Sequence, residues 1–489
     1  MRTDLQRAGP VLLAAAALGA LSLVALDRQR AAPGDAGVPA APAASGAAAA
    51  PGDTAGRGAV LTRTYVVRPG DTLGAIAAQH ATTVGALMAA NDIADADAIF
   101  VGQELRLQVL PSGEGPALRT VPDGELVHGP AYVGFDVAAV VARHGGPLAG
   151  YVETVNGSTL SGAEIVRRVA RDFSVGPRVL LAFLEARSGY VTGVAPAGAA
   201  APQYPAGLED PARAGLWLQL NWLADRLNGG YYDWRGRDNR ILTLRDGTVW
   251  AGHPTLDAGS FAVQRALGLQ SGPAELPERI AAFDAAYRRL FGPPEAHRPA
   301  VPSGAAAAFP LLALPWARGE LWWFTGGPHG GWAEGSGWAA LDFVPDGDPL
   351  GCAVAAAWVT AVADGLLIEA GEGALYLDLD ADGHRQTGPG VFYLHLAELG
   401  RARPGTRVAR GDRLGHPSCE GGQSTATHLH IARLRDGEWL PAAGDDPFVM
   451  GGWRATGAPK AYDGGLAHDD GRRREACECR REGTNDVSW

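Results

Sequence analysis

Histidine and aspartate residues that could bind a metal ion gather in the last third of the chain. Six of the twelve histidines lie between residues 329 and 430. His428 and His430 stand two residues apart in THLHIARL, a segment typical of a β-strand, so strand alternation puts both side chains on one face. His395 lies in a second such segment, FYLHLAEL, and His329 precedes Asp342 in a glycine-rich stretch. Two or three histidines with one carboxylate are the ligands that zinc uses when its fourth position stays open for water.

The segments around these residues are short apolar runs that Gly, Asp and Pro turns separate. Examples are AAWVTAVADGLLIEA, ALYLDLDADG and VFYLHLAEL. Runs of this length between turn residues are typical of antiparallel strands. We therefore expect residues 305–452 to form an antiparallel β-sheet domain that carries these histidines.

The same region resembles a known enzyme family. Residues 310–450 are similar to the lysostaphin-type (LytM-like) zinc metallo-endopeptidases, which cut peptide bonds in bacterial peptidoglycan. The segments that carry the resemblance are, in order, the Tyr-x-His-Leu run (Tyr393, His395 and Leu396), PGTRVARGDRLG and the H-x-H strand. The resemblance implies that one Zn²⁺ ion is held by His329, Asp342 and His430. It also implies that His395 and His428 are the catalytic pair that flanks the attacking water.

The spacing of the first two ligands departs from the family pattern. Twelve residues, GGWAEGSGWAAL, separate His329 from Asp342, whereas the family usually has three residues between its first histidine and its aspartate. A long glycine-rich loop can still bring both to one ion, because ligands must converge in space and need no fixed interval. The alternative carboxylates are Asp346, Asp348 and Glu334.

The chain has four cysteines, too few for a disulfide-rich scaffold. Cys352 and Cys419 lie inside the sheet region, and Cys419 stands in the loop before the H-x-H strand. In an oxidising compartment these two could form a disulfide, which would keep His428 and His430 in register.

A compact module lies earlier in the chain. Residues 63–110 contain a short strand, a turn, two short helices and a closing strand. Their V-x-P-G-D-T-L and L-x-x-A-N motifs resemble those of the LysM domain, which binds glycans that contain N-acetylglucosamine. The resemblance implies a glycan-binding groove lined by Gly70, Asp71, Thr72, Asn91, Asp92 and Ile93. For Asp71 or Thr72, capping of the first helix is the alternative role.

Residues 127–300 have a helical pattern and follow a linker at 111–126. Ser161 and Glu164 have the spacing of a capping box, and Pro177 stands where a helix is expected to begin. Gly229-Gly230 is expected to end a long helix. The sequence thus predicts a mostly α-helical domain.

One stretch of this domain, LLAFLEARSGY, faintly resembles lysozyme-like transglycosylases. In that family the helix ends in Glu-Ser-Gly, and the glutamate is the general acid. Here Arg187 stands directly before Ser188, and Glu185 lies about 200° away around the helix. A structural role, as in a degenerate lysozyme-like domain, is therefore favoured over glycosidic catalysis.

Residues 1–30 have the pattern of an export signal. Arg2 and Arg7 precede an uncharged stretch from Ala8 to Leu26, which as a helix would span about 28 Å. A retained signal anchor is favoured over a cleaved signal peptide, because no small-x-small site directly follows Leu26. Residues 31–62 are an Ala/Pro/Gly linker. The later domains are therefore expected outside the membrane, in the cell envelope or secreted.

The composition limits the classes of partner. A formal net charge of −11 argues against a non-specific nucleic-acid binder, which would carry a basic face. The polar residues 453–489 are expected to be a disordered tail. The predicted fold is multidomain α+β, with a βααβ LysM module, a helical domain and an antiparallel β-sheet metallopeptidase domain.

These features predict an exported zinc-dependent endopeptidase that LysM holds on peptidoglycan and that cuts its stem peptides or cross-bridges. The alternative is a non-catalytic wall-binding scaffold, or an amidase activator with an inactive peptidase fold. Such relatives usually lose metal ligands, whereas the set in this chain is complete.

Overall fold

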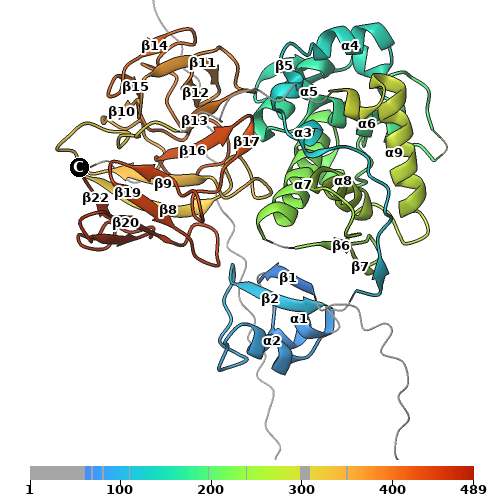
Figure 1. Cartoon of the computed structure of the whole chain (residues 1–489), viewed down its shortest axis with the longest axis horizontal. Helices are drawn as coiled ribbons and strands as arrows, with labels where there is room; N and C mark the ends of the chain where they lie inside the picture. Colours follow the sequence, from blue (N-terminus) through green and yellow to red (C-terminus); the bar gives the residue numbers. More distant parts are fainter. Residues whose placement is uncertain are drawn as a thin grey trace, which may run out of the picture. The chain divides into compact units, whose positions relative to one another are not determined.

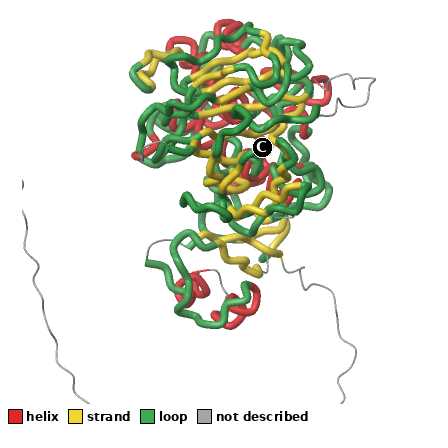
Figure 2. The backbone as a smooth tube through the Cα atoms, turned by 90° about the vertical axis from the view of Figure 1, so that its left-hand side faces the viewer, coloured by secondary structure: helices red, strands yellow, loops and turns green. Residues whose placement is uncertain are grey.

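The computed structural model describes residues 61–67, 70–79, 82–109, 111–196, 198–237, 239–297, 309–347 and 351–489. In these residues a small module, a helical domain and a β-sheet domain follow one another along the chain (Figure 1). Figure 2 colours the same chain by secondary structure, with helices red and strands yellow. The multidomain α+β prediction is confirmed. The predicted signal segment and most of the linker that follows it lie outside the described residues. No described helix combines the length and apolar character that crossing a bilayer requires.

The first module has the expected β-α-α-β order. Its elements are β1 (Leu61–Val66), α1 (Leu73–Gln79), α2 (Val84–Ala90) and β2 (Glu104–Val109). The two strands pair antiparallel, and the helices contribute Leu73, Ile76 and Leu87 to a small core with Leu105. Thr83 caps α2 by accepting a hydrogen bond from the Ala86 amide.

The helical domain contains seven α-helices among the described residues. They are α3 (Asp123–Leu126), α4 (Val137–His144), α5 (Gly162–Phe173), α6 (Pro177–Ser188), α7 (Leu216–Gly236), α8 (Ala258–Gly268) and α9 (Leu276–Phe291). Short 3₁₀ turns and strands connect them: β3 (Gly113–Glu114), η1 (Pro130–Tyr132), η2 (Pro147–Gly150), β4 (Val152–Val155), β5 (Ser158–Ser161), η3 (Pro211–Arg213), β6 (Ile241–Thr243), β7 (Val249–Ala251) and η4 (Pro294–His297).

Local sequence signals set most of these helix boundaries. Ser161 and Glu164 form the predicted capping box of α5, and Pro177 is the first residue of α6. The prediction that Gly229-Gly230 ends a helix is wrong, because α7 continues to Gly236. A Cβ on Gly230 would lie 2.7 Å from Cα of Ala262 in α8. Gly230 therefore serves the close packing of two helices and does not end one.

The sheet domain is built on one sheet of nine strands among the described residues. Its order is β14 (Arg407–Val408), β11 (Gly365–Gly371), β12 (Ala374–Asp378), β13 (Pro389–Leu394), β16 (Leu429–Arg435), β9 (Ala340–Pro345), β8 (Trp322–His329) and β22 (Asp486–Val487), with β17 (Glu438–Trp439) beside β16. Each pair of neighbours is antiparallel, as predicted. The smaller pieces are the pair β10 (Val359–Thr360) and β15 (Arg413–Gly415), and the sheet β18 (Val449–Met450), β19 (Trp453–Thr456), β20 (Gly465–His468) and β21 (Arg473–Glu475).

Both faces of the large sheet are buried. Leu429 and Ile431 of β16 belong to the core of the sheet domain, whereas Ala432 and Leu434 belong to the same hydrophobic core as the helical domain. By alternation, His430 lies on the face that contributes Ala432 and Leu434. The face that carries the H-x-H motif is therefore the face that the helical domain covers.

The predicted disorder of residues 453–489 is wrong. These residues form β19 to β22, and β22 pairs with β8 at the edge of the large sheet. Trp453, Leu466 and Val487 are buried in the core of the sheet domain. Polar residues separate these apolar side chains widely, so the composition resembles that of a disordered tail although each apolar residue has a place in the core.

His128, where the helical and sheet domains meet, should make stability depend on pH. Burial, with the charges of Arg385, Arg171 and Arg178, lowers the pKa of His128 to about 3. In the unfolded chain its pKa returns to about 6.5, so the unfolded state alone takes up a proton between these values. This contribution to the free energy of unfolding is complete above pH 6.5 and is lost as the pH falls towards 3.

Urea unfolding of metal-free protein between pH 7.5 and pH 4.5 measures this effect. The free energy of unfolding should fall with pH, and the slope should be smaller in His128→Gln, which cannot take up the proton. Equal slopes in the two proteins would exclude His128 as a source of the acid sensitivity.

Candidate metal centre

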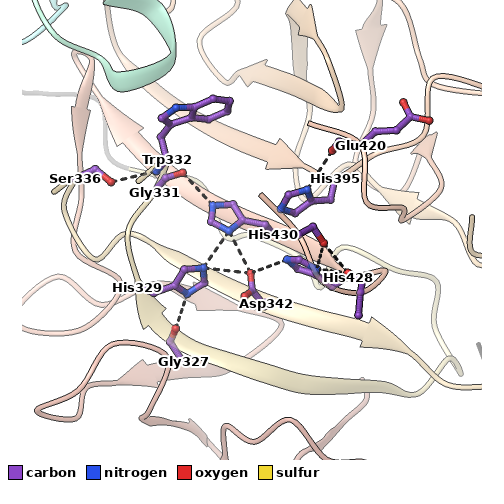
Figure 3. A network of polar contacts seen from close by, with 12 residues as sticks. Gly327, His329, Gly331, Trp332, Ser336, Asp342, His395, Glu420, His428 and His430 are labelled. Carbon is purple, nitrogen blue, oxygen red and sulfur yellow. Dashed lines mark hydrogen bonds and ion pairs between the residues drawn. The ribbon is translucent and has the colours of Figure 1, made fainter. Parts of the chain in front are cut away.

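Three side chains from three neighbouring strands converge on one point of the sheet domain (Figure 3). His329 ends β8, Asp342 lies in β9 and His430 lies in β16, where it is directly opposite Asp342. His329 Nε2 lies 3.0 Å from His430 Nδ1 and 3.3 Å from Asp342 Oδ1, and His430 Nδ1 lies 3.2 Å from the same oxygen. All three residues are buried. The twelve-residue spacing is therefore no obstacle, because pairing of β8 with β9 brings its two ends together.

These donors fit an ion of the size of zinc. In a tetrahedral site with bonds of about 2.0–2.1 Å, two ligand atoms lie about 3.3–3.4 Å apart, close to the three distances in this cluster. Asp342 Oδ1 is also a buried atom without a hydrogen-bond partner in the structure. A buried carboxylate oxygen in that position needs a cation, and two imidazole nitrogens face it.

Backbone carbonyls fix the orientation of all four imidazoles around this point. Each outward ring nitrogen lies at hydrogen-bond distance from a carbonyl oxygen: His329 Nδ1 from Gly327 (2.8 Å), His430 Nε2 from Gly331 (3.0 Å), His428 Nδ1 from Ala426 (2.8 Å) and His395 Nδ1 from Glu420 (3.1 Å). With these nitrogens donating, the opposite nitrogens carry lone pairs. Hydrogen bonds of this kind, from the ring nitrogen that faces away from the ion, set the tautomer of a metal-binding histidine.

His395 and His428 lie together beside the three candidate ligands. Their ring centroids are 4.4 Å apart, and His428 Nε2 lies 3.7 Å from Asp342 Oδ1. His395 follows directly on β13 with a φ of +63°, a backbone conformation that a residue with a side chain seldom adopts. Strain of this kind is typical of functional sites, where the surrounding structure holds it in place.

The electrostatics favour an ionised aspartate among neutral imidazoles. Burial by itself raises the pKa of Asp342, but the neighbouring rings of His329, His428 and His430 bring it well below the ordinary range. Burial lowers the pKa of His430, and burial with the neighbouring His428 and His430 lowers that of His395 to about 3. Neutral imidazole is the form that binds a metal ion.

The alternative carboxylates do not share this point. Asp346 accepts a hydrogen bond from Trp323 Nε1 at 3.0 Å, and Glu334 is exposed in the loop between β8 and β9. Asp348 lies outside the described residues.

Tyr462 is a part of the site that the sequence did not reveal. Its ring stacks on His329 with centroids 4.1 Å apart and an angle of 19° between the planes. Burial, with the negative charges of Asp342 and Glu334, raises the pKa of its phenol to about 12. The residue lies in the segment that was expected to be disordered, and only its aromatic character could have drawn attention to it.

Cys352 and Cys419 are joined by a disulfide. The adjacent Ser418 accepts a backbone hydrogen bond from His428 and donates one to the His395 carbonyl at 2.6 Å. The disulfide therefore lies next to the backbone contacts that Ser418 makes with His395 and His428.

The structure gives several candidate glycan-binding residues roles within the LysM module. The Asn91 side chain bonds the backbone of Leu87 and Arg106, and Thr72 accepts a hydrogen bond from the Ala75 amide in the first turn of α1. Asp71 accepts a hydrogen bond from the Tyr65 hydroxyl. Gly70 is exposed, Asp92 and Ile93 have positions beyond the end of α2, and Ile93 packs partly against the core. Contact with glycan stays a prediction for all six residues.

Gly326 leaves room for the aspartate, so a methyl group there should weaken metal binding. A Cβ at this position would lie 2.6 Å from Asp342 Oδ2. Gly326→Ala should therefore displace the carboxylate and weaken zinc binding by about tenfold or more, as loss of a positioning contact does. Chelator competition measures the affinity. The control is Gly236→Ala at the end of α7, where no atom lies within 4 Å of the added carbon. A Gly326→Ala protein that binds zinc as tightly as this control would contradict the expectation.

Two family models match the chain. Residues 65–108 match the LysM domain, and residues 119–302 match the family described as LasA, N-terminal domain. The second match covers the helical domain. A degenerate lysozyme-like origin of this domain stays a prediction.

Curated relatives and solved structures extend the comparison. The chain is 24% identical over 310 residues to Protease LasA of Pseudomonas aeruginosa, a match that covers 60% of this chain and 69% of that protein. Among solved structures, the M23 metalloprotease pseudoalterin from the deep sea is 25% identical, with 35% of this chain and 96% of that chain covered and a TM-score of 0.28. The catalytic domain of lysostaphin from Staphylococcus simulans is 22% identical, with 25% and 87% covered and a TM-score of 0.18. The two family matches and the similarity to Protease LasA together support a LytM-like metallopeptidase with a LysM domain.

Proposed function

We propose that this protein is an exported, zinc-dependent endopeptidase that cuts amide bonds in the stem peptides or cross-bridges of peptidoglycan. The observation that carries the proposal is the triangle of His329 Nε2, Asp342 Oδ1 and His430 Nδ1, with edges of 3.0 to 3.3 Å, beside two further imidazoles. The relationship to Protease LasA supports the reaction class, and the LysM domain supports the cell wall as the place of action.

The three ligands would hold one Zn²⁺ ion and leave a coordination position open. When bound, zinc lowers the pKa of a water molecule towards about 7 and polarises a scissile carbonyl. The chain must supply the proton transfers. With Nδ1 of His395 and His428 donating to carbonyls, both Nε2 atoms can accept a hydrogen bond from the attacking water.

The two flanking histidines differ in what they can do. Burial, with His428 and His430 nearby, lowers the pKa of His395 to about 3, which favours a neutral ring that orients the water. We assign proton transfer from the water to the leaving amine to His428 Nε2, because His428 is less buried than His395. His428 is also the most exposed of the five residues, with 17% of its side chain accessible against 10% for Asp342 and 3% for His329. Substrate is expected to enter from the side of His428.

Export and attachment complete the proposal. The LysM module would bind glycan through Gly70, Asp71 and Thr72 on one side and Asn91, Asp92 and Ile93 on the other. Residues 1–30 would hold the protein in the membrane with its domains outside. Cell fractionation should find the full chain in the membrane fraction and a chain beginning at residue 31 behind a cleavable signal outside it. Recovery of both proteins in the soluble fraction would contradict the proposed membrane anchor, but not the proposed enzymatic activity.

The decisive experiment combines metal analysis with digestion of purified peptidoglycan. The protein should contain one zinc ion per chain, and mass spectrometry of the released fragments should find new amino termini. New sugar ends would instead assign the cleavage to the helical domain. A zinc-free protein that releases nothing would support the non-catalytic scaffold.

A further inference from the structure

The loop that links the two first metal ligands rests on the helical domain. This loop, residues 330–338 (GGWAEGSGW), begins directly after His329. Its Gly335 amide donates a hydrogen bond of 2.7 Å to Asp225 Oδ1 in α7. Its Trp332 ring packs edge-on against Phe173 of α5, with centroids 6.3 Å apart. The helical domain also reaches the end of the loop, where the Arg237 guanidinium lies 5.3 Å from the centroid of the Trp338 ring. Among these contacts, the Asp225 hydrogen bond is the one that holds a backbone amide of the loop.

The same loop sets the orientation of a metal ligand. The Gly331 carbonyl lies 3.0 Å from His430 Nε2, so that nitrogen is the donor and Nδ1 faces His329 and Asp342 (Figure 3). The position of one carbonyl therefore decides which nitrogen of His430 points to the centre.

The loop has little stiffness of its own. Four of its nine residues are glycine, which has the largest backbone freedom to lose on ordering. Inside the loop, Ser336 bonds the amides of Trp332 and Ala333, and the Gly331 amide donates to the Gly337 carbonyl at 3.1 Å. These bonds close the loop on itself but do not fix it relative to β16. Gly335 lies tightly against α7, since a Cβ there would lie 2.0 Å from the Asp225 carbonyl oxygen.

We propose that Asp225 is a positioning residue of the metal centre. By holding the Gly335 amide, it fixes the 330–338 loop, and through the Gly331 carbonyl it keeps His430 Nδ1 directed at the ion. The helical domain would then contribute to metal affinity, in addition to separating the LysM domain from the sheet domain. This inference rests on the proposed zinc site, but it concerns affinity for the metal and not the bond that is cut.

Zinc affinity of the full chain, measured by competition with a chelating dye, tests the proposal. Asp225→Ala should weaken zinc binding about tenfold, the lower end of what loss of an outer contact costs. Asp225→Asn should bind within about twofold of the parent, because its amide oxygen can still accept the Gly335 hydrogen bond. Should Asp225→Ala fail to fold, Asp225→Ser is the second variant, since its side chain is too short to reach Gly335.

The matched control is Asp136→Ala, which removes the cap of α4 elsewhere in the helical domain. It should lower the unfolding temperature without changing zinc affinity. The proposal is overturned if Asp225→Ala, or Asp225→Ser in its place, binds zinc as tightly as the parent, or if Asp136→Ala loses as much affinity as Asp225→Ala. Failure of the parent itself to bind zinc would refute the proposed function instead, so the two failures are distinguishable.

Discussion

His430→Ala is expected to abolish both zinc binding and peptidoglycan cleavage, whereas His428→Ala should lose rate and keep its metal. His430 supplies one corner of the ligand triangle, and its removal also leaves the Asp342 carboxylate with one fewer partner. Loss of a hydrogen bond to a metal ligand typically lowers affinity by roughly 10–100-fold. Loss of the ligand His430 itself should lower zinc affinity by more than that. His428 lies outside the triangle, so His428→Ala should reduce kcat by about 10²–10⁴, the range for loss of a general acid–base group.

The measurements are zinc content after dialysis and the rate of release of new amino termini. His384→Ala is a matched control, because His384 is an exposed histidine of the same domain outside the centre. If His430→Ala kept full zinc and activity, the assignment of the ligands would be wrong. If His428→Ala lost its zinc as readily as His430→Ala, His428 would be a ligand and not an acid–base group.

Trp439→Ala is expected to destabilise the protein by about 3–5 kcal/mol, the range for truncation of a buried aromatic side chain. Trp439 is fully buried where the sheet and the helical domain share a core. Its Nε1 donates to the Phe173 carbonyl at 3.2 Å, and its ring fills the space beside Gly331, where a Cβ would lie 2.3 Å from it. The truncation would thus open a cavity beside the loop that orients His430.

Urea unfolding measures the loss of stability. The variant Trp439→Phe separates the contribution of apolar packing from that of the Nε1 hydrogen bond. The smaller ring keeps most of the apolar contact and removes one of two hydrogen bonds to the Phe173 carbonyl, since Asn228 Nδ2 also donates to it at 2.7 Å. About 0.5–1.5 kcal/mol, the net contribution of one hydrogen bond, should therefore be lost. A cost below about 1 kcal/mol for Trp439→Ala would mean that the two domains do not depend on this contact for stability.

Sequence reasoning succeeded where the rule was local. The capping box of Ser161 and Glu164 needs only four consecutive residues, and alternation in THLHIARL places His428 and His430 with no knowledge of other strands. The order of elements in the LysM module follows from similarly short motifs. The structure brings the three proposed ligands together, and their recognition rested on the family resemblance as much as on their chemistry.

Reasoning from sequence failed where the reason for a residue lies far away in the chain. Gly230 is small because Ala262 packs against it, and no nearby residue signals this. Tyr462 stacks on a histidine more than one hundred residues earlier. The contact of Asp225 with Gly335 likewise joins two domains. These features depend on tertiary packing, which propensity and periodicity do not encode.

The pairing of β22 with β8 has a consequence for the order of assembly. The strand that ends in His329 has β9 on one side and residues 486–487 on the other, so its last neighbour is synthesised long after it. Contacts of such large sequence separation form slowly, because much chain entropy is lost before they are made. Until residues 486–487 pair with it, β8 should therefore remain an open edge strand, with its amides and carbonyls available to other chains. Maturation of the enzyme would then be governed by the arrival of this late segment, and a short deletion there should promote aggregation even though it removes no group that touches the ion.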